Sequence, residues 1–136
     1  MKRSVLAAAL LLAACTPPPP QTAAPACAAP LKAALQVDLY FGRGNAGGEV
    51  SEAQWASFLN QEVTPRFPDG LSVFDVSGQY RNARGTIERE RSKRLTVVVF
   101  DPPSHLAKVQ AIVAAYSRRH GQDSVLRVEQ PVCANL

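Results

Sequence analysis

The chain has 136 residues, of which 46% are hydrophobic and 19% charged, and its formal net charge is +4. This length suits one domain and hardly two. Removal of Lys2 and Arg3, which belong to the export segment described next, leaves a charge of +2, so the charge balance does not indicate a nucleic-acid-binding protein. With two histidines and no Cys-x-x-Cys pair, the sequence also lacks the ligands of a zinc or haem site.

Residues 1–14 have the pattern of a lipoprotein signal peptide. A positive start, Met-Lys-Arg, precedes residues 5–12, which contain only Val, Leu and Ala. This apolar run is too short to span a bilayer as a helix. Small residues stand directly before Cys15, so we predict that Cys15 is the acylated first residue of the mature protein and that palmitate-type chains hold it at the membrane. The alternatives are the export signal of a soluble protein and a short buried helix.

The segment that follows the signal peptide is predicted to be a stalk. Residues 15–30 contain six prolines, five alanines and no charged side chain. This composition cannot build a core and favours extended polyproline II. Thr16 stands where an Asp would favour retention in the inner membrane, so we expect the outer membrane, facing the periplasm, as the location. The folded domain is then residues 31–136.

Cys27 and Cys133 are the two remaining cysteines. In an oxidising compartment they form the intramolecular pair that is available once Cys15 carries lipid, and we predict a disulfide between them. Unpaired thiols and a bond between two molecules are the alternatives. In the chain-entropy model, closing a loop of about 100 residues contributes about 5 kcal/mol.

The first half of the domain predicts a strand, a helix and a second strand. Residues 35–41 alternate between apolar and polar and end at a glycine, which is typical of a half-buried strand. Ser51 and Gln54 form a capping-box pattern before apolar residues at helical spacing. A turn with two prolines, residues 64–70, leads to a strand near residues 71–76.

The second half predicts a strand, a helix and a last strand. Residues 87–100 form the third strand, whose end is apolar on both faces and therefore central in the sheet. Ser104 is expected to cap a helix that ends at Gly121, and residues 124–129 supply the last strand. The order β-α-β-β-α-β predicts an α+β ferredoxin-like sandwich, with two helices on one face of a four-stranded antiparallel sheet. The same order also builds homodimers in which two sheets face each other, and the two-sided apolarity of residues 97–100 is compatible with either arrangement.

Several segments of the domain resemble one protein family. They are Tyr40 to Gly42, Trp55 with Phe58, Val63 to Leu71, Arg89 to Lys93 and Gly121 to Leu126. On these segments the chain resembles the small bacterial secreted proteins and lipoproteins of the DUF3574 family over nearly the whole folded part. Tyr80 and His120 depart from the family pattern, which has a Trp and an aromatic residue at these positions. The resemblance implies no activity.

A set of polar residues is the candidate anion or ligand site. It comprises Arg66, Tyr80, Arg81, Glu88, Glu90 and Lys93. Arg66 lies in the proline-bounded turn and is preorganised for bidentate contacts with a carboxylate or phosphate, but we expect it first to pair inside the protein, with Glu88, Glu90 or Asp69. Glu88 and Glu90 share a strand face, which is an arrangement used in acid–base chemistry. Four neighbouring cations favour an ordinary solvated ladder instead.

Other patterns predict no active site. The Gly-x-Gly-x-x-Gly spacing at residues 42–47 fits a dinucleotide fingerprint, but the intervening residues separate it from the helix start. Ser104 and His105 lack the Gly-x-Ser-x-Gly context of a nucleophile, and His120 near a helix C-terminus suits a cation that complements the helix dipole. We therefore predict no catalytic residue, cofactor or metal.

Two classes of function stay open. Anchor, stalk and compact domain favour a non-enzymatic binding or interaction module of the cell envelope, for which the sequence names no partner or ligand. The alternative is a small envelope enzyme with its site in a cleft of a dimeric α+β barrel. A deep pocket lined by Tyr40, Tyr80, Arg66 and Glu90 would favour the enzyme.

Overall fold

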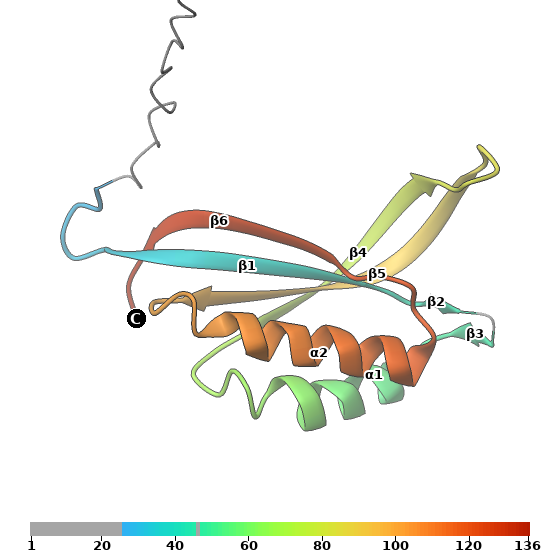
Figure 1. Cartoon of the computed structure of the whole chain (residues 1–136), viewed down its shortest axis with the longest axis horizontal. Helices are drawn as coiled ribbons and strands as arrows, with labels where there is room; N and C mark the ends of the chain where they lie inside the picture. Colours follow the sequence, from blue (N-terminus) through green and yellow to red (C-terminus); the bar gives the residue numbers. More distant parts are fainter. Residues whose placement is uncertain (1–25, 46) are drawn as a thin grey trace, which may run out of the picture.

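The computed structural model describes residues 26–45 and 47–136 (Figure 1). The predicted signal peptide of residues 1–14, the predicted lipidation site Cys15 and the stalk up to residue 25 lie outside the described residues. None of the described helices has the length and apolarity needed to cross a membrane.

Four long strands form an antiparallel sheet in the order β4-β5-β1-β6. Their bounds are β1 (Lys32–Gly42), β4 (Ser72–Arg81), β5 (Ile87–Val99) and β6 (Leu126–Ala134). Helix α1 (Glu52–Phe58) continues as a π-helical turn, η1 (Leu59–Val63), and α2 spans His105–His120. The loop after β1 contains a small hairpin, β2 (Gly44–Asn45) with β3 (Gly48–Glu49), which the sequence did not predict. The predicted α+β ferredoxin-like fold is confirmed, with β5 in the interior of the sheet.

The core lies between the sheet and the two helices, which cover one face of it (Figure 1). Strands β1 and β5 align Val37 with Val97 and Leu39 with Leu95, and these side chains are buried. Aromatic rings fill the space under the helices: the centroids of Phe41 and Tyr116 are 4.7 Å apart, with Trp55 and Phe58 packed beside them. The hydroxyl of Tyr116 donates a 2.8 Å hydrogen bond to the carbonyl of Gly42. Burial raises the pKa of Tyr116 to about 12.

The helix ends agree only in part with the sequence predictions. The capping box at Ser51 and Gln54 is present, with both reciprocal hydrogen bonds, and α2 ends at Gly121 in the left-handed conformation. Ser104 does not cap α2. Its backbone is already helical (φ −53°, ψ −27°) after the turn that begins at Asp101, and a side-chain cap needs an extended backbone at that residue.

His120 has a packing role that the sequence did not indicate. Burial and the charge of Arg119 lower the pKa of His120, which disfavours the cation that was expected to complement the helix dipole. The ring instead packs 4.7 Å from that of Tyr116 and 6.2 Å from that of Phe58, measured between centroids. His120 therefore extends the aromatic core.

Two strands are longer than the sequence indicated. β4 continues to Arg81 and β6 continues to Ala134, beyond the predicted ends at residues 76 and 129. The alternation fails to show these extensions because β6 and the end of β4 are largely exposed on both faces. The tip of the β4–β5 hairpin rises away from the helices (Figure 1).

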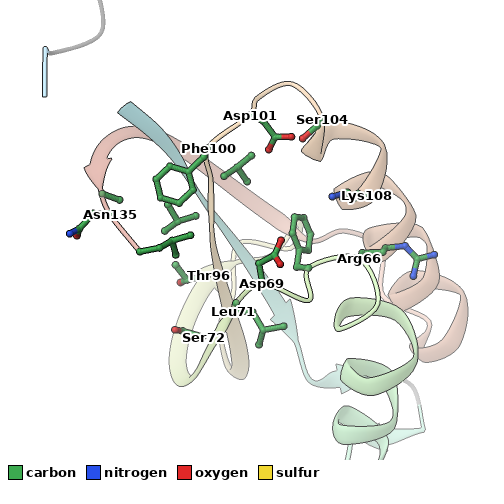
Figure 2. Close-up of a pocket in the computed structure, with 16 residues that line it drawn as sticks. Arg66, Asp69, Leu71, Ser72, Thr96, Phe100, Asp101, Ser104, Lys108 and Asn135 are labelled. Carbon is green, nitrogen blue, oxygen red and sulfur yellow. The ribbon is translucent and has the colours of Figure 1, made fainter. Parts of the chain in front are cut away.

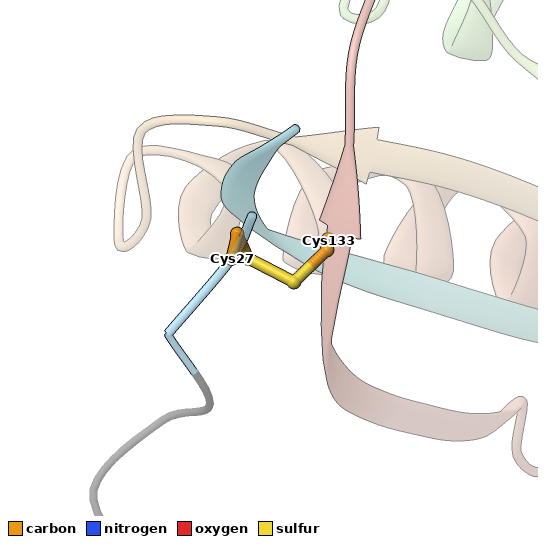
Figure 3. Close-up of a disulfide and its surroundings, with 2 residues drawn as sticks. All are labelled: Cys27 and Cys133. Carbon is orange, nitrogen blue, oxygen red and sulfur yellow. A yellow bond between two sulfur atoms is a disulfide. The ribbon is translucent and has the colours of Figure 1, made fainter. Parts of the chain in front are cut away.

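The structure joins Cys27 to Cys133 in the disulfide that the sequence predicted (Figure 3), with Cα atoms 5.6 Å apart. Ala33 of β1 pairs with Cys133 of β6 in the sheet, so the disulfide adds a covalent link at an end where two strands already meet. It connects the segment that precedes β1 to the last strand across 106 positions of sequence.

Replacing both cysteines, Cys27→Ser with Cys133→Ser, should lower the free energy of unfolding by about 2 to 5 kcal/mol, because a long loop of the unfolded chain is no longer closed. Urea unfolding of the oxidised wild type and of the double variant measures the difference. Reduced wild type is the control, and it should unfold near the midpoint of the variant. Two alkylatable thiols in untreated wild type would contradict the disulfide.

Candidate functional site

The six residues predicted as a ligand site do not form one site. Three of them, Tyr80, Arg81 and Glu88, lie at the tip of the β4–β5 hairpin. Glu90 lies further along β5, opposite Gly78 of β4. Lys93 is buried under α1, and Arg66 follows η1. The structure thus separates them into places with different partners.

The hairpin residues satisfy one another. The hydroxyl of Tyr80 donates to Glu88 Oε2 (2.7 Å), and the side-chain amide of Asn82 donates to Glu88 Oε1 (2.6 Å). Hydrogen bonds from Asn82 and Tyr80 lower the pKa of Glu88, and the bond to Glu88 raises the pKa of Tyr80. Arg81 Nη1 donates to the carbonyl of Gly85 (2.8 Å), which closes the hairpin turn.

Glu90 binds backbone. Its Oε1 accepts a 3.0 Å hydrogen bond from the amide of Gly44. A Cβ atom at Gly42 would lie 2.5 Å from the same oxygen, so only glycine leaves room for this carboxylate. Glu88 and Glu90 therefore hold different groups, and the structure offers no shared proton site between them.

Lys93 belongs to an ion-pair network in which the cations are buried and the carboxylates are exposed. Only 4% of Lys93 is exposed, and its Nζ lies 2.5 Å from Asp75 Oδ1 and 2.9 Å from Glu52 Oε2. Arg43, also 4% exposed, donates to Glu52 (2.7 Å) and twice to the carbonyl of Val50 (2.9 and 2.6 Å). The network fastens the start of α1 to strands β4 and β5.

The sequence could have indicated this role for Lys93. Lys93 continues the alternation of Leu95, Val97 and Val99, so it falls on the helix-covered face of β5. A charge on that face has to find partners. Arg43 is also buried and also finds partners, but it lies in a loop, where no alternation of apolar residues indicates which side chains are buried.

The predicted partners of Arg66 were wrong. Arg66 Nη1 donates to the carbonyl (2.6 Å) and the Oε2 (3.1 Å) of Glu62, one helical turn earlier. Glu62 Oε1 accepts in turn from Arg119 of α2 (2.5 Å). Glu88 and Glu90 are out of reach because they lie on β5 toward the hairpin, whereas Arg66 follows η1 near the start of β4. Arg66 thus closes the end of the first helix and links it to the second.

Arg66 also lines a cavity of about 630 Å³ (Figure 2). The cavity lies where the loop before β4, the end of β5, the start of α2 and the last residues of the chain meet. Its apolar walls come from Phe67, Leu71, Val98, Val99 and Phe100. We call it the end cavity. Because Ala134 to Leu136 line it, it lies near the disulfide at Cys133.

The charged groups of the end cavity are largely unengaged. Asp69 and Asp101 have no side-chain hydrogen bond or ion pair among the described residues, and Asp101 lies beside Ser104 at the start of α2 (Figure 2). Lys108 has no ion pair in the same set, and its Nζ lies 5.5 Å from the centre of the Phe67 ring. This contrasts with the network of Lys93, in which every charge has a partner.

One edge of β5 faces the end cavity. Pairing of β4 with β5 begins at Ser72 opposite Thr96. Residues 97–99 pair with β1 on one side only, and no backbone hydrogen bond reaches their other side within the described chain. The cavity therefore combines apolar walls, free charges and an unpaired strand edge.

No element of the described chain covers the face of the sheet opposite the helices. This face carries apolar side chains that are more than 40% exposed, namely Phe74, Val98, Leu126 and Val128. The guanidinium of Arg94 lies over the Phe74 ring, 4.3 Å from its centre. We call this the open face. Within the described residues no group of three or more His, Cys, Asp or Glu is arranged to hold a metal ion.

The fold and these features define a small ferredoxin-like α+β protein. Residues 36–136 match the model of the family described as "Protein of unknown function (DUF3574)". The chain belongs to this family, as its sequence motifs indicated. No curated protein matched the chain.

Solved structures with a similar backbone include two of a phage SAM lyase and one of CutA. A phage SAM lyase in complex with S-methyl-5'-thioadenosine has a TM-score of 0.54 at 15% identity, over 76% of this chain and 90% of that chain. A phage SAM lyase in the apo state gives 0.54 at 16% identity, over 74% and 84%. CutA from Synechococcus elongatus PCC7942 gives 0.49 at 12% identity, over 75% and 80%. At these identities the similarity establishes the fold alone.

Arg66→Ala should lower the free energy of unfolding by about 1 kcal/mol, because the carbonyl and carboxylate of Glu62 lose a charged donor. Arg66→Lys should recover part of the loss. Arg89→Ala is the control, since Arg89 is exposed and has no ion pair in the described structure, and it should stay within about 0.5 kcal/mol of wild type. The urea unfolding midpoints of the variants measure the difference. Equal midpoints for the Arg66 and Arg89 variants would contradict a structural role of Arg66.

Lys93→Met should flatten the acid dependence of stability. The hydrogen bond from Lys93 lowers the pKa of Glu52 below 4.5 and that of Asp75 below 3.8. Carboxylates with a lowered folded pKa contribute stability above these values, and they lose it as the pH falls through the folded pKa. Thermal unfolding from pH 6 to strongly acidic pH should therefore show a shallower decline for Lys93→Met than for wild type. A parallel decline would refute the coupling, and Arg89→Met serves as the matched control.

Proposed function

We propose that this protein is a lipid-anchored binding module of the cell envelope, and that the end cavity is its ligand site. The observation that carries the proposal is the contrast in charge pairing. Arg43, Lys93 and the hairpin residues are engaged inside the protein, whereas Asp69 and Asp101 line the end cavity without a side-chain partner among the described residues, and Lys108 lies over the Phe67 ring without an ion pair. Ligand pockets are mostly apolar with a few polar groups in the wall, and the end cavity has this composition.

The anchor is inferred from the sequence, because residues 1–14 followed by Cys15 have the lipoprotein pattern. The disulfide fixes Cys27 at the end of the sheet that carries the cavity. Residues 16–26 then form the tether, with a reach of about 35 Å when extended. We place the module at the outer membrane facing the periplasm, with its end cavity on the side of the tether.

The enzyme alternative, with its site in a cleft of a dimeric α+β barrel, stays a prediction, and the lining of the end cavity does not favour it. We expected an enzyme to have a deep pocket lined by Tyr40, Tyr80, Arg66 and Glu90. Of these four residues, only Arg66 lines the end cavity. Tyr80 and Glu90 are held by Glu88 and by the amide of Gly44. The homodimer through the sheet face stays a prediction, and the exposed apolar side chains of the open face are compatible with it.

Cys15→Ser should abolish lipid attachment, because the thioether needs the sulfur of that residue. Metabolic labelling with a palmitate analogue, followed by mass spectrometry of the membrane fraction, should show a modified N-terminus at Cys15 in wild type. The variant should accumulate as unlabelled precursor. Cys27→Ser is the control and should be labelled like wild type. A mature N-terminus at another residue would refute the anchor.

Ser104→Trp should fill the end cavity. Ser104 is exposed and makes no capping bond, so the change should leave the fold intact. Native mass spectrometry of the full-length protein, extracted from membranes in mild detergent, should show a bound species in wild type and its loss in Ser104→Trp. Ser124→Trp, at an exposed loop position, is the matched control and should keep it. Equal occupancy in all three proteins, or no bound species in wild type, would contradict a ligand site in the end cavity.

A further inference from the structure

We propose that the end cavity takes an extended polypeptide segment with basic side chains, which adds as a strand to the free edge of β5 at residues 97–99. The inference rests on the proposed function, because it names the class of ligand for the same site. Three features of the cavity carry it: a strand edge without a partner, walls on both faces of the sheet, and an excess of free carboxylates.

The strand edge supplies backbone recognition. Val97, Val98 and Val99 pair with Val37, Gln36 and Leu35 of β1, and β4 reaches only to Thr96 on the other side. Successive residues of a strand direct their N–H and C=O groups to alternate sides, so at least one of the three presents both groups to the end cavity. Such groups are a template for another extended chain. β5 is paired on both sides from Ser92 to Thr96, so the free edge at residues 97–99 begins where β4 ends.

The walls suit a strand better than a compact small molecule. Thr96 and Val98 belong to the open face, whereas Val99 is buried on the helix-covered face, and all three line the same cavity. The cavity therefore passes around the edge of β5 and reaches both faces of the sheet. An added strand points alternate side chains to the two faces. Phe67 and Lys108 would meet the side chains on the helix side.

The charges favour a basic segment. Arg66 is already paired with Glu62, and Lys108, the other cation of the wall, makes no ion pair in the described structure and lies over the Phe67 ring. Asp69 and Asp101 are two free carboxylates in the same wall. A segment that carries lysine or arginine between apolar residues would pair with these carboxylates, and an acidic segment would meet them with like charge.

The experiment uses the full-length protein in detergent and two blocked hexapeptides of alternating sequence, one with Val and Lys and one with Val and Asp. Amide chemical shifts and hydrogen exchange report binding at millimolar peptide. We expect the Lys peptide to perturb the amides of residues 97–100 and to slow exchange at the free edge. The Asp peptide should bind about tenfold more weakly or not at all.

N-methylation tests strand addition itself. Two further Lys peptides carry N-methyl groups on alternate residues, one on the odd and one on the even positions, so each has one edge without donors. The peptide that is blocked on the edge facing β5 should bind about tenfold more weakly, while its counterpart keeps most of the affinity. Ser104→Trp should abolish binding of the unmethylated peptide and Ser124→Trp should not.

Three results would overturn the inference. In the first, the Lys peptide does not perturb the amides of residues 97–100. In the second, both N-methylated peptides bind equally. In the third, the free protein is a dimer in which the amides of the β5 edge are protected from exchange without peptide. The first two leave the proposed function standing if native mass spectrometry finds another species that Ser104→Trp displaces. If native mass spectrometry finds no bound species but the Lys peptide binds, a resident ligand is rejected and the peptide site is retained.

Discussion

The register between β1 and β5 is the constraint on which the rest of the structure depends. It aligns Val37 with Val97 and Leu39 with Leu95, so that both interior strands bury residues of the same parity. A shift by one residue would turn these side chains to the open face and expose the core. The same register brings Phe41 opposite Lys93, and thereby decides that a charge is buried next to the aromatic cluster. The ion-pair network is a consequence of this placement.

Fold and core could be predicted from the sequence because they follow from short-range patterns. Alternation at residues 35–41, the capping box at Ser51 and the glycine at position 121 each reported a local preference that the structure keeps. The partners of Arg66 could not be predicted in the same way. Glu62 becomes its neighbour only because the helix continues through a π-helical turn to Val63, and no local pattern announces that continuation.

The end cavity was missed for a related reason. It arises because β4 begins opposite Thr96, which leaves three residues of β5 without a neighbour on that side. The sequence pattern predicts where each strand begins and ends, but it does not predict how many residues of β4 and β5 pair with each other. Only Arg66 among the predicted residues borders the cavity, and its guanidinium is already bound to Glu62. The sequence indicated Asp69 only as a partner of Arg66, and Asp101 and Lys108 stand in it as isolated surface charges, which are ordinary.

The disulfide at Cys27 also determines how the domain would bear a mechanical load. A pull along the chain that precedes Cys27 passes through the sulfur atoms into Cys133, and so reaches β1 and β6 at the same end of the sheet. The load then divides between β1 and β6, which pair with each other from Lys32 onward, and β5 holds β1 on its other side from Leu35 onward. The first residues of β1 therefore do not bear the whole load alone. Oxidation state would set the force at which such a tethered domain opens.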